Sequence, residues 1–173
     1  MPAGTDNLGN DMRKLLASLA LVPLLTGCAP QGGLEITDYW VKSSEMSTVG
    51  RMTAVYGTIT NNSSQDVVLV GGATEVAGVV EVHEMAMIDG EMKMQEVDGG
   101  LVVPAGKSVV LEPGGDHLML MMLTSDIVAG GTIEVLFDFD GAEDITLTDV
   151  IAKPAEGGDE EYHSDHNHGE MDN

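Results

Sequence analysis

Short segments rich in Val, Ile and Thr recur through residues 34–151, and clusters of Gly, Pro, Asn and Asp separate them. Segments of this composition and length are typical of β-strands bounded by turns. The turn signals include Asp89-Gly90 and Gly130-Gly131, and this region shows no convincing helical period. We expect strands over residues 34–43, 53–60, 66–70, 79–87, 92–97, 108–111, 117–123, 132–139 and 145–151.

Regularly spaced short strands predict an all-β fold. About 8–9 such strands suit a Greek-key β-sandwich or barrel. The size of this region is sufficient for one domain with its own core. We therefore place a single β domain at residues 34–153.

The N-terminal segment has the features of a secretory signal. Met12 precedes a basic pair, and the apolar run 15–25 and small residues lead to Cys28. Leu25-Thr-Gly-Cys28 resembles the bacterial lipobox, which implies that residues 1–27 are removed and that Cys28 carries lipid. Met12 is then a candidate for the true start. The sequence predicts an extracytoplasmic protein that is lipid-anchored to a bacterial cell membrane, with residues 28–33 as a tether.

Composition excludes several classes of protein. Cys28 is the only cysteine, so a lipidated chain has no thiol for a disulfide or for a blue-copper centre. The net charge of −22 argues against a nucleic-acid partner. No nucleophilic triad, paired carboxylates or phosphate loop stands out, and we do not expect an enzyme.

Residues 154–173 differ sharply from the domain, being acidic, nearly free of apolar side chains and without Lys or Arg. We expect this tail to be disordered. Its clustered imidazoles predict a metal site that accepts Cu(II), and also Zn(II) or Ni(II). The candidate ligands are His163, His166, His168 and Met171.

The other two of the five histidines each begin an alternation with methionine. These strings are His83-Glu-Met85-Ala-Met87 and His117-Leu-Met119-Leu-Met121-Met122. Methionines at alternating strand positions are commonly core residues. Because both histidines of the domain lead such strings, coincidence is a poor explanation. Imidazole with thioether is a ligand set that suits Cu(I) and disfavours Zn, Mg and Ca.

The Asp89-Gly90 turn predicts the register of a β-hairpin. Met87 then lies opposite Met92, and Met85 opposite Met94. His83 shares this face, and His117, Met119 and Met121 share one face of a later strand. If these faces meet at a rim, two imidazoles and two thioethers can hold one ion, with Asp116 or Glu84 orienting a histidine. The register leaves open whether Met85 or Met94 completes the site.

Together these residues resemble the PCuAC family of periplasmic copper chaperones, over about residues 34–151. The family motif has a His, a Met after ten intervening residues and a later His-x-Met, which His83, Met94 and His117-Leu-Met119 match. Between Met94 and His117 lie 22 residues, one more than in the motif. Further matching strings are Met52-Thr-Ala-Val-Tyr-Gly57 and Pro113-Gly-Gly-Asp-His-Leu-Met-Leu120.

The resemblance implies a cupredoxin-like β-barrel with Cu(I) bound at an exposed site by His83, Met94, His117 and Met119. It also implies delivery of copper to the copper subunit of cytochrome c oxidase. We expect Met85, Met87, Met121 and Met122 to form a soft rim where a partner docks. An envelope copper buffer or detoxification protein without an oxidase client would share all of these ligands, so this alternative stays open.

Overall fold

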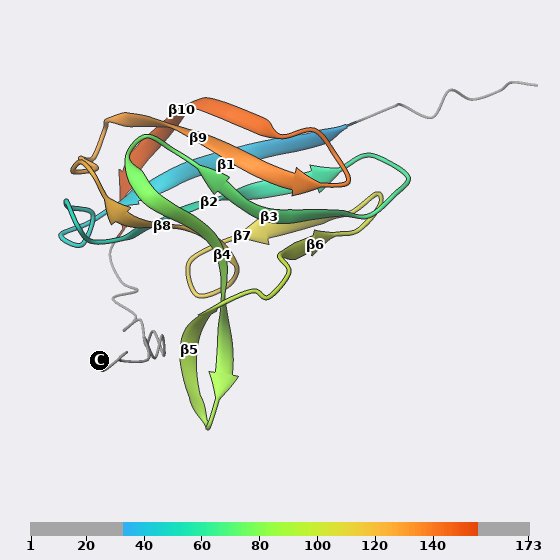
Figure 1. Ribbon diagram of the computed structural model, residues 1–173, viewed down its shortest axis with the longest axis horizontal. Helices are drawn as coiled ribbons and strands as arrows, with labels where there is room; N and C mark the ends of the chain where they lie inside the picture. The colour runs from blue at the N-terminus through green and yellow to red at the C-terminus, as the bar shows by residue number, and fades with distance from the viewer. Residues whose placement is uncertain (1–32, 156–173) are drawn as a thin grey trace, which may run out of the picture.

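The computed structural model describes residues 33–155, which form one continuous β-structure (Figure 1). Ten strands make a sheet in the order β5-β4-β8-β2-β1-β10-β9-β3-β6, and β7 pairs with β2. Their bounds are β1 Leu34–Ser43, β2 Thr53–Asn61, β3 Val67–Ala73, β4 Ala77–Ile88, β5 Glu91–Glu96, β6 Leu101–Val103, β7 Ser108–Leu111, β8 His117–Leu123, β9 Thr132–Asp140 and β10 Ile145–Pro154.

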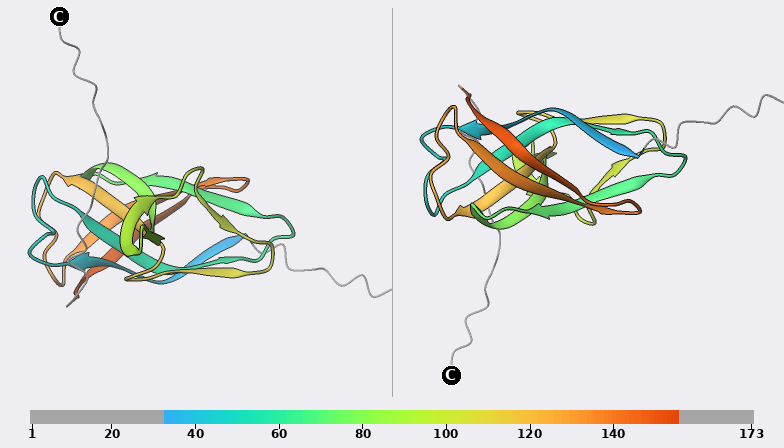
Figure 2. Two further views of the ribbon diagram at one scale, coloured as in Figure 1. Left: turned by 90° about the horizontal axis from the view of Figure 1, so that it is seen from below. Right: turned by 90° about the horizontal axis from the view of Figure 1, so that it is seen from above.

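The sheet folds over into two layers because β10 belongs to both (Figure 2). Its first part pairs antiparallel with β9, from Ile145 to Ile151. Its last residues pair parallel with β1, where Val41 lies opposite Ala152. A break in register between Leu147 and Val150 marks the bend between the two parts. Bulges of this kind let one strand pass from one layer to the other.

The two layers enclose the main hydrophobic core. Val55 and Ile59 of β2, Leu69 of β3 and Phe137 of β9 are fully buried there. These positions alternate with outward-facing residues along each strand, as expected for a packed β-sheet. The core is built from side chains far apart in sequence, so it forms only when both layers come together.

Strand β8 is buried on both faces. Leu118 and Leu120 enter the main core, whereas His117 and Met119 face a second, smaller cluster on the outer side of the same layer. This cluster contains Met94 and Tyr56 among its buried residues. The His-Leu-Met-Leu alternation of β8 is therefore an alternation between two apolar environments.

The predicted all-β fold is confirmed, and each of the nine expected strands is present within a few residues. The tenth strand, β6, was missed because it has only three residues. β10 reaches Pro154, one residue past the expected domain boundary. The signal segment, Cys28 and the tail histidines lie outside the described residues. Within residues 33–155 no helix is long and apolar enough to cross a membrane.

A core substitution on β3 tests the two-layer packing. Leu69 is completely buried, whereas its neighbour Val70 is 45% exposed. We expect Leu69→Ala to lower the free energy of unfolding by about 2–5 kcal/mol, through lost burial and a residual cavity. Val70→Ala, on the opposite face of the same strand, should cost less than about 1 kcal/mol. Chemical denaturation of both variants measures the difference, and equal losses would contradict the assigned facing of β3.

Candidate metal site

The β4–β5 hairpin has the register that its turn predicts. Asp89 and Gly90 both have positive φ, at 54° and 87°, as a two-residue type I′ turn requires. Ile88 pairs with Glu91. It follows that Met87 lies opposite Met92, and Met85 lies opposite Met94. The sequence-based prediction of this hairpin is thus confirmed pair by pair.

The two histidines are direct cross-strand neighbours. β4 pairs antiparallel with β8, and in this register His83 lies opposite His117. The ring centroids are 6.0 Å apart. We expected two separate faces to meet at a rim. Instead, one continuous face of three adjacent strands, β5, β4 and β8, carries both histidines together with Met94 and Met119.

These four side chains are buried, contrary to the exposed site that the family resemblance implied. The exposed fraction is 0% for His83, 3% for His117, 4% for Met119 and 7% for Met94. The expectation was wrong because the outer face of this layer is covered by a second apolar cluster. Its further members are Ala54 and Tyr56, with Trp40, Met52, Met85 and Met121 packed against it.

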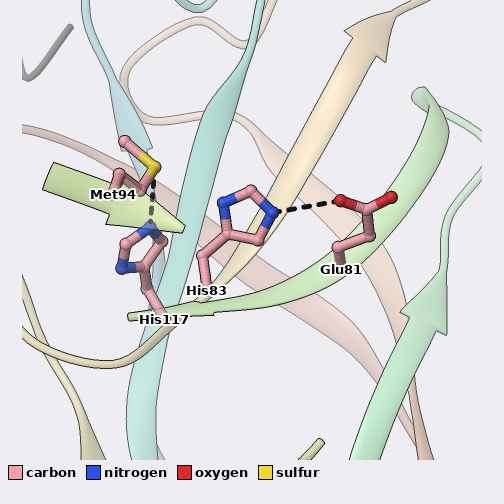
Figure 3. A network of polar contacts seen from close by, with 4 residues as sticks. All are labelled: Glu81, His83, Met94 and His117. Carbon is pink, nitrogen blue, oxygen red and sulfur yellow. Dashed lines mark hydrogen bonds and ion pairs between the residues drawn. The ribbon is translucent and has the colours of Figure 1, made fainter. Parts of the chain in front are cut away.

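His117 has one ring nitrogen engaged by the backbone and the other facing sulfur (Figure 3). Its Nδ1 lies 2.9 Å from the carbonyl oxygen of Gly115, which can only accept, so Nδ1–H is the donor. In neutral His117, Nε2 then carries a lone pair, and it lies 3.4 Å from Sδ of Met94. Nitrogen and sulfur lone pairs facing each other at this distance are suited to share a soft cation.

His83 is oriented by a carboxylate on its own strand. Its Nε2 lies 3.0 Å from Oε2 of Glu81, and because an ionised carboxylate only accepts, Nε2–H donates this hydrogen bond. In neutral His83 the lone pair is then on Nδ1, which faces the Met94 and His117 side in Figure 3. The orienting groups are therefore Glu81 and the Gly115 carbonyl. Glu84, one of the two carboxylates expected in this role, accepts a hydrogen bond from Gln95 at 2.9 Å.

Carboxylates gather beside the His117 end of the site. Partial burial raises the pKa of Asp116 above its ordinary value, and the negative charges of Glu84 and Glu112 raise it further, whereas His117 lowers it. Like charges raise the pKa of a carboxyl group when they lie near it, so Glu84 and Glu112 lie on the same side of the site as Asp116. Their combined potential favours a cation at this end of β8.

Two aromatic residues that the sequence analysis did not single out continue the line of ring contacts that begins with His83 and His117. Tyr56 lies 6.3 Å from His117 and Trp40 lies 4.7 Å from Tyr56, both measured between ring centroids. Lys153 Nζ lies 5.8 Å from the Trp40 ring centroid. The sequence offers only a weak indication of their role: Trp40 is the only tryptophan, and Tyr56 belongs to one of the strings that resemble the family.

The chemistry of the site depends on sulfur. Among residues 33–155, no group of three or more His, Cys, Asp or Glu side chains is arranged to hold a metal ion. A metal at His83 and His117 would need Met94 and Met119 to complete its shell. Neutral thioethers suit Cu(I) and are poor ligands for Zn, Mg and Ca.

The methionines of the expected docking rim do not form one patch. Met87 is 65% exposed near the hairpin tip, and Met121 is half-buried against the second cluster. Met122 is 57% exposed, has a φ of 52° and packs over Gly78 at the other end of β4. Gly78 and Met87 are nine residues apart on β4, a contour length of roughly 30 Å.

Comparison with known proteins supports the lipoprotein and fold predictions. Residues 34–151 match the protein family described as "Putative lipoprotein LpqE-like". A protein of Leifsonia xyli subsp. xyli, named "Putative lipoprotein Lxx21020", is 32% identical over 150 residues. That alignment covers 80% of this chain and 87% of the relative.

Solved structures confirm the cupredoxin-like fold and the resemblance to PCuAC domains. The apo PCuAC domain from PmoF1 superposes with a TM-score of 0.57 at 20% identity, covering 71% of this chain and 96% of that domain. The solution structure of CuI-DR1885 from Deinococcus radiodurans is 28% identical, with a TM-score of 0.50. It covers 72% of this chain and 80% of that protein.

The hydrogen bonds predict opposite tautomers for the two histidines. In the metal-free chain at about pH 9, where ordinary imidazoles are neutral, His83 should carry its proton on Nε2 and His117 on Nδ1. Long-range ¹H–¹⁵N correlation spectra of the imidazole rings distinguish these forms. Glu81→Gln should weaken the preference at His83 and leave His117 unchanged. The same tautomer at both residues would contradict the geometry.

Proposed function

We propose that this chain, which belongs to the LpqE-like lipoprotein family, is a membrane-anchored carrier of Cu(I). The observation that carries the proposal is the buried group formed by His83, Met94, His117 and Met119 on one face of β5, β4 and β8. The 28% identity with DR1885, whose structure was solved with Cu(I), supports copper as the cargo.

Each of the four side chains has an assigned atom. Nδ1 of His83 and Nε2 of His117 are the imidazole donors, because their other nitrogens are held by Glu81 and the Gly115 carbonyl. Met94 supplies the sulfur that lies 3.4 Å from His117. Met119 supplies the second thioether. Met85, half-buried opposite Met94, is the alternative fourth ligand.

This ligand set favours transfer over permanent storage. Thioethers bind without losing a proton and carry no charge, so an incoming ligand replaces them without proton release. The Glu81–His83 hydrogen bond fixes one imidazole in a binding orientation before copper arrives, which reduces the ordering cost of binding. We infer a carrier without enzymatic activity of its own.

The same Cu(I) site would serve either of two functions. The first is delivery to the copper subunit of cytochrome c oxidase, as in the family that the sequence resembles. The second is buffering or detoxification in the envelope without an oxidase client. Incubating the Cu(I)-loaded chain with the soluble domain of the apo oxidase subunit separates them, because only a delivery protein would transfer its copper.

The proposed location rests on the N-terminal segment. Residues 1–27 would direct export, and Cys28 would carry the lipid that anchors residues 28–33 to the outside of a bacterial cell membrane. The family and the relative are both described by the words "Putative lipoprotein", which supports this location. Met87, Met121 and Met122 remain proposed contacts for a partner, as separate points of contact and not as one rim.

A Cu(I) competition titration tests the domain site. To isolate that site, the chain carries alanine at His163, His166 and His168. We expect one tightly bound Cu(I) per chain and a large loss of affinity in Met94→Leu, Met119→Leu and His117→Ala. Met→Leu nearly conserves side-chain volume and should cost less than about 1.5 kcal/mol of stability. Met122→Leu is the matched control and should bind as the parent chain does; tight binding retained in all three site variants would refute the assignment.

A second titration tests the proposed Cu(II) site of the tail. Replacing His163, His166 and His168 by alanine should remove Cu(II) binding that the intact chain shows, because imidazole is the main Cu(II) ligand in residues 154–173. Cu(I) affinity at the domain should stay unchanged. Electron paramagnetic resonance counts bound Cu(II) in both chains. An unchanged Cu(II) stoichiometry after the triple substitution would contradict the tail proposal.

A further inference from the structure

The proposed ligands are poorly accessible to a copper donor. His83, His117, Met119 and Met94 each have at most 7% of their surface exposed. A donor protein or a small Cu(I) complex therefore cannot reach both imidazoles directly from solvent. Copper therefore needs a series of intermediate ligands. The first of them must be exposed to solvent, and the last must adjoin the buried group.

We propose that four methionines of the β4–β5 hairpin, namely Met87, Met92, Met85 and Met94, form a thioether path that conducts Cu(I) from the hairpin tip to the buried site. This inference rests on the proposed function, since it assumes that Cu(I) is the cargo. It adds an entry site at Met87 and Met92. The hairpin projects from the body of the fold, which places its tip within reach of a donor (Figure 1).

The register puts the four sulfurs on one face in two consecutive pairs. Met87 lies opposite Met92, and Met85 lies opposite Met94. Directly opposed side chains have Cβ atoms about 4.5–5.5 Å apart, and residues two apart on a strand are roughly 7 Å apart. Flexible methionine side chains bridge both separations. Each pair can therefore hold one ion between its sulfurs, and the next pair lies within reach.

Burial increases step by step along this path. Met87 is 65% exposed and Met92 is 53% exposed, Met85 is half-buried, and Met94 is 7% exposed. Met94 in turn lies 3.4 Å from Nε2 of His117. The ion thus exchanges solvent for protein ligands gradually and meets its first imidazole only at the end of the path.

The charges of the hairpin suit a cation on this face. Lys93 pairs with Ala86, so it lies on the opposite face, and its Nζ is 3.9 Å from Glu91. Glu96, opposite His83, shares the methionine face. The methionine face of the described hairpin therefore presents thioethers, an imidazole and a carboxylate, with no lysine or arginine to repel Cu(I).

Each step of the transfer is a ligand exchange. One thioether sulfur binds Cu(I) as another leaves, the metal stays in the +1 state, and no proton is released because thioethers are neutral. The last step replaces the Met85 sulfur by the imidazoles of His117 and His83. The buried site retains copper because imidazoles join the thioethers there.

Loading kinetics test the path. The donor is the Cu(I) complex of bathocuproine disulfonate, which has no protein surface to dock, and stopped-flow absorbance follows its loss of copper under anaerobic conditions. We expect the Met87→Leu/Met92→Leu chain to load several-fold more slowly than the parent chain, with equilibrium affinity unchanged. Leucine keeps the apolar surface, so the slowing reports the loss of sulfur. Met122→Leu, an equally exposed methionine off the path, should load at the parent rate.

A binding measurement gives a second readout. Ag(I), a redox-inert soft cation, is titrated into the full chain while the ¹³C-labelled methionine methyl groups are observed by NMR. The first equivalent should shift Met94 and Met119, and an excess should then shift Met87 and Met92 but leave Met122 in place. Unchanged loading rates in the double variant, or a fall in its equilibrium affinity, would overturn the path while the buried site stands. Failure of the parent chain to bind Cu(I) would overturn the proposed function and the path together.

Discussion

The register of β4 between β5 and β8 is the constraint on which the site depends. In this register His83 on β4 pairs with His117 on β8, and Met85 on β4 pairs with Met94 on β5. Side chains alternate between faces with a period of two, so a slip of one residue would turn the histidine and the methionines to opposite sides of the layer. The tight turn at Asp89 and Gly90 fixes the pairing with β5 and thereby protects it against such a slip.

The position of β8 explains why a polar histidine pair can be buried. Leu118 and Leu120 anchor the strand in the main core, which holds the backbone of the site in place. On the other face, Tyr56 and Trp40 cover the layer beside His117. The site is rigid because one strand belongs to two packed clusters. Close-packed protein interiors leave little freedom for the side chains they hold.

Local features of the site could be predicted from the sequence, and its long-range features could not. The hairpin register follows from two turn residues, and the facing of His117 and Met119 follows from strand alternation. The direct pairing of β4 with β8 joins segments about thirty residues apart, and no local signal selects this partner. The burial of the site was missed for the same reason, because its cover comes from Trp40 and Tyr56 on β1 and β2.

Charge balance connects the burial of the site with its choice of cargo. A buried ion is costly unless an opposite charge lies close by. The four proposed ligands are neutral, and Glu81, bound to Nε2 of His83 with its side chain 28% exposed, supplies one negative charge next to them. That carboxylate offsets the cost of burying a +1 ion among neutral ligands. The choice between Cu(I) and the more abundant divalent metals then depends on the softness of the two sulfur ligands, which favours Cu(I).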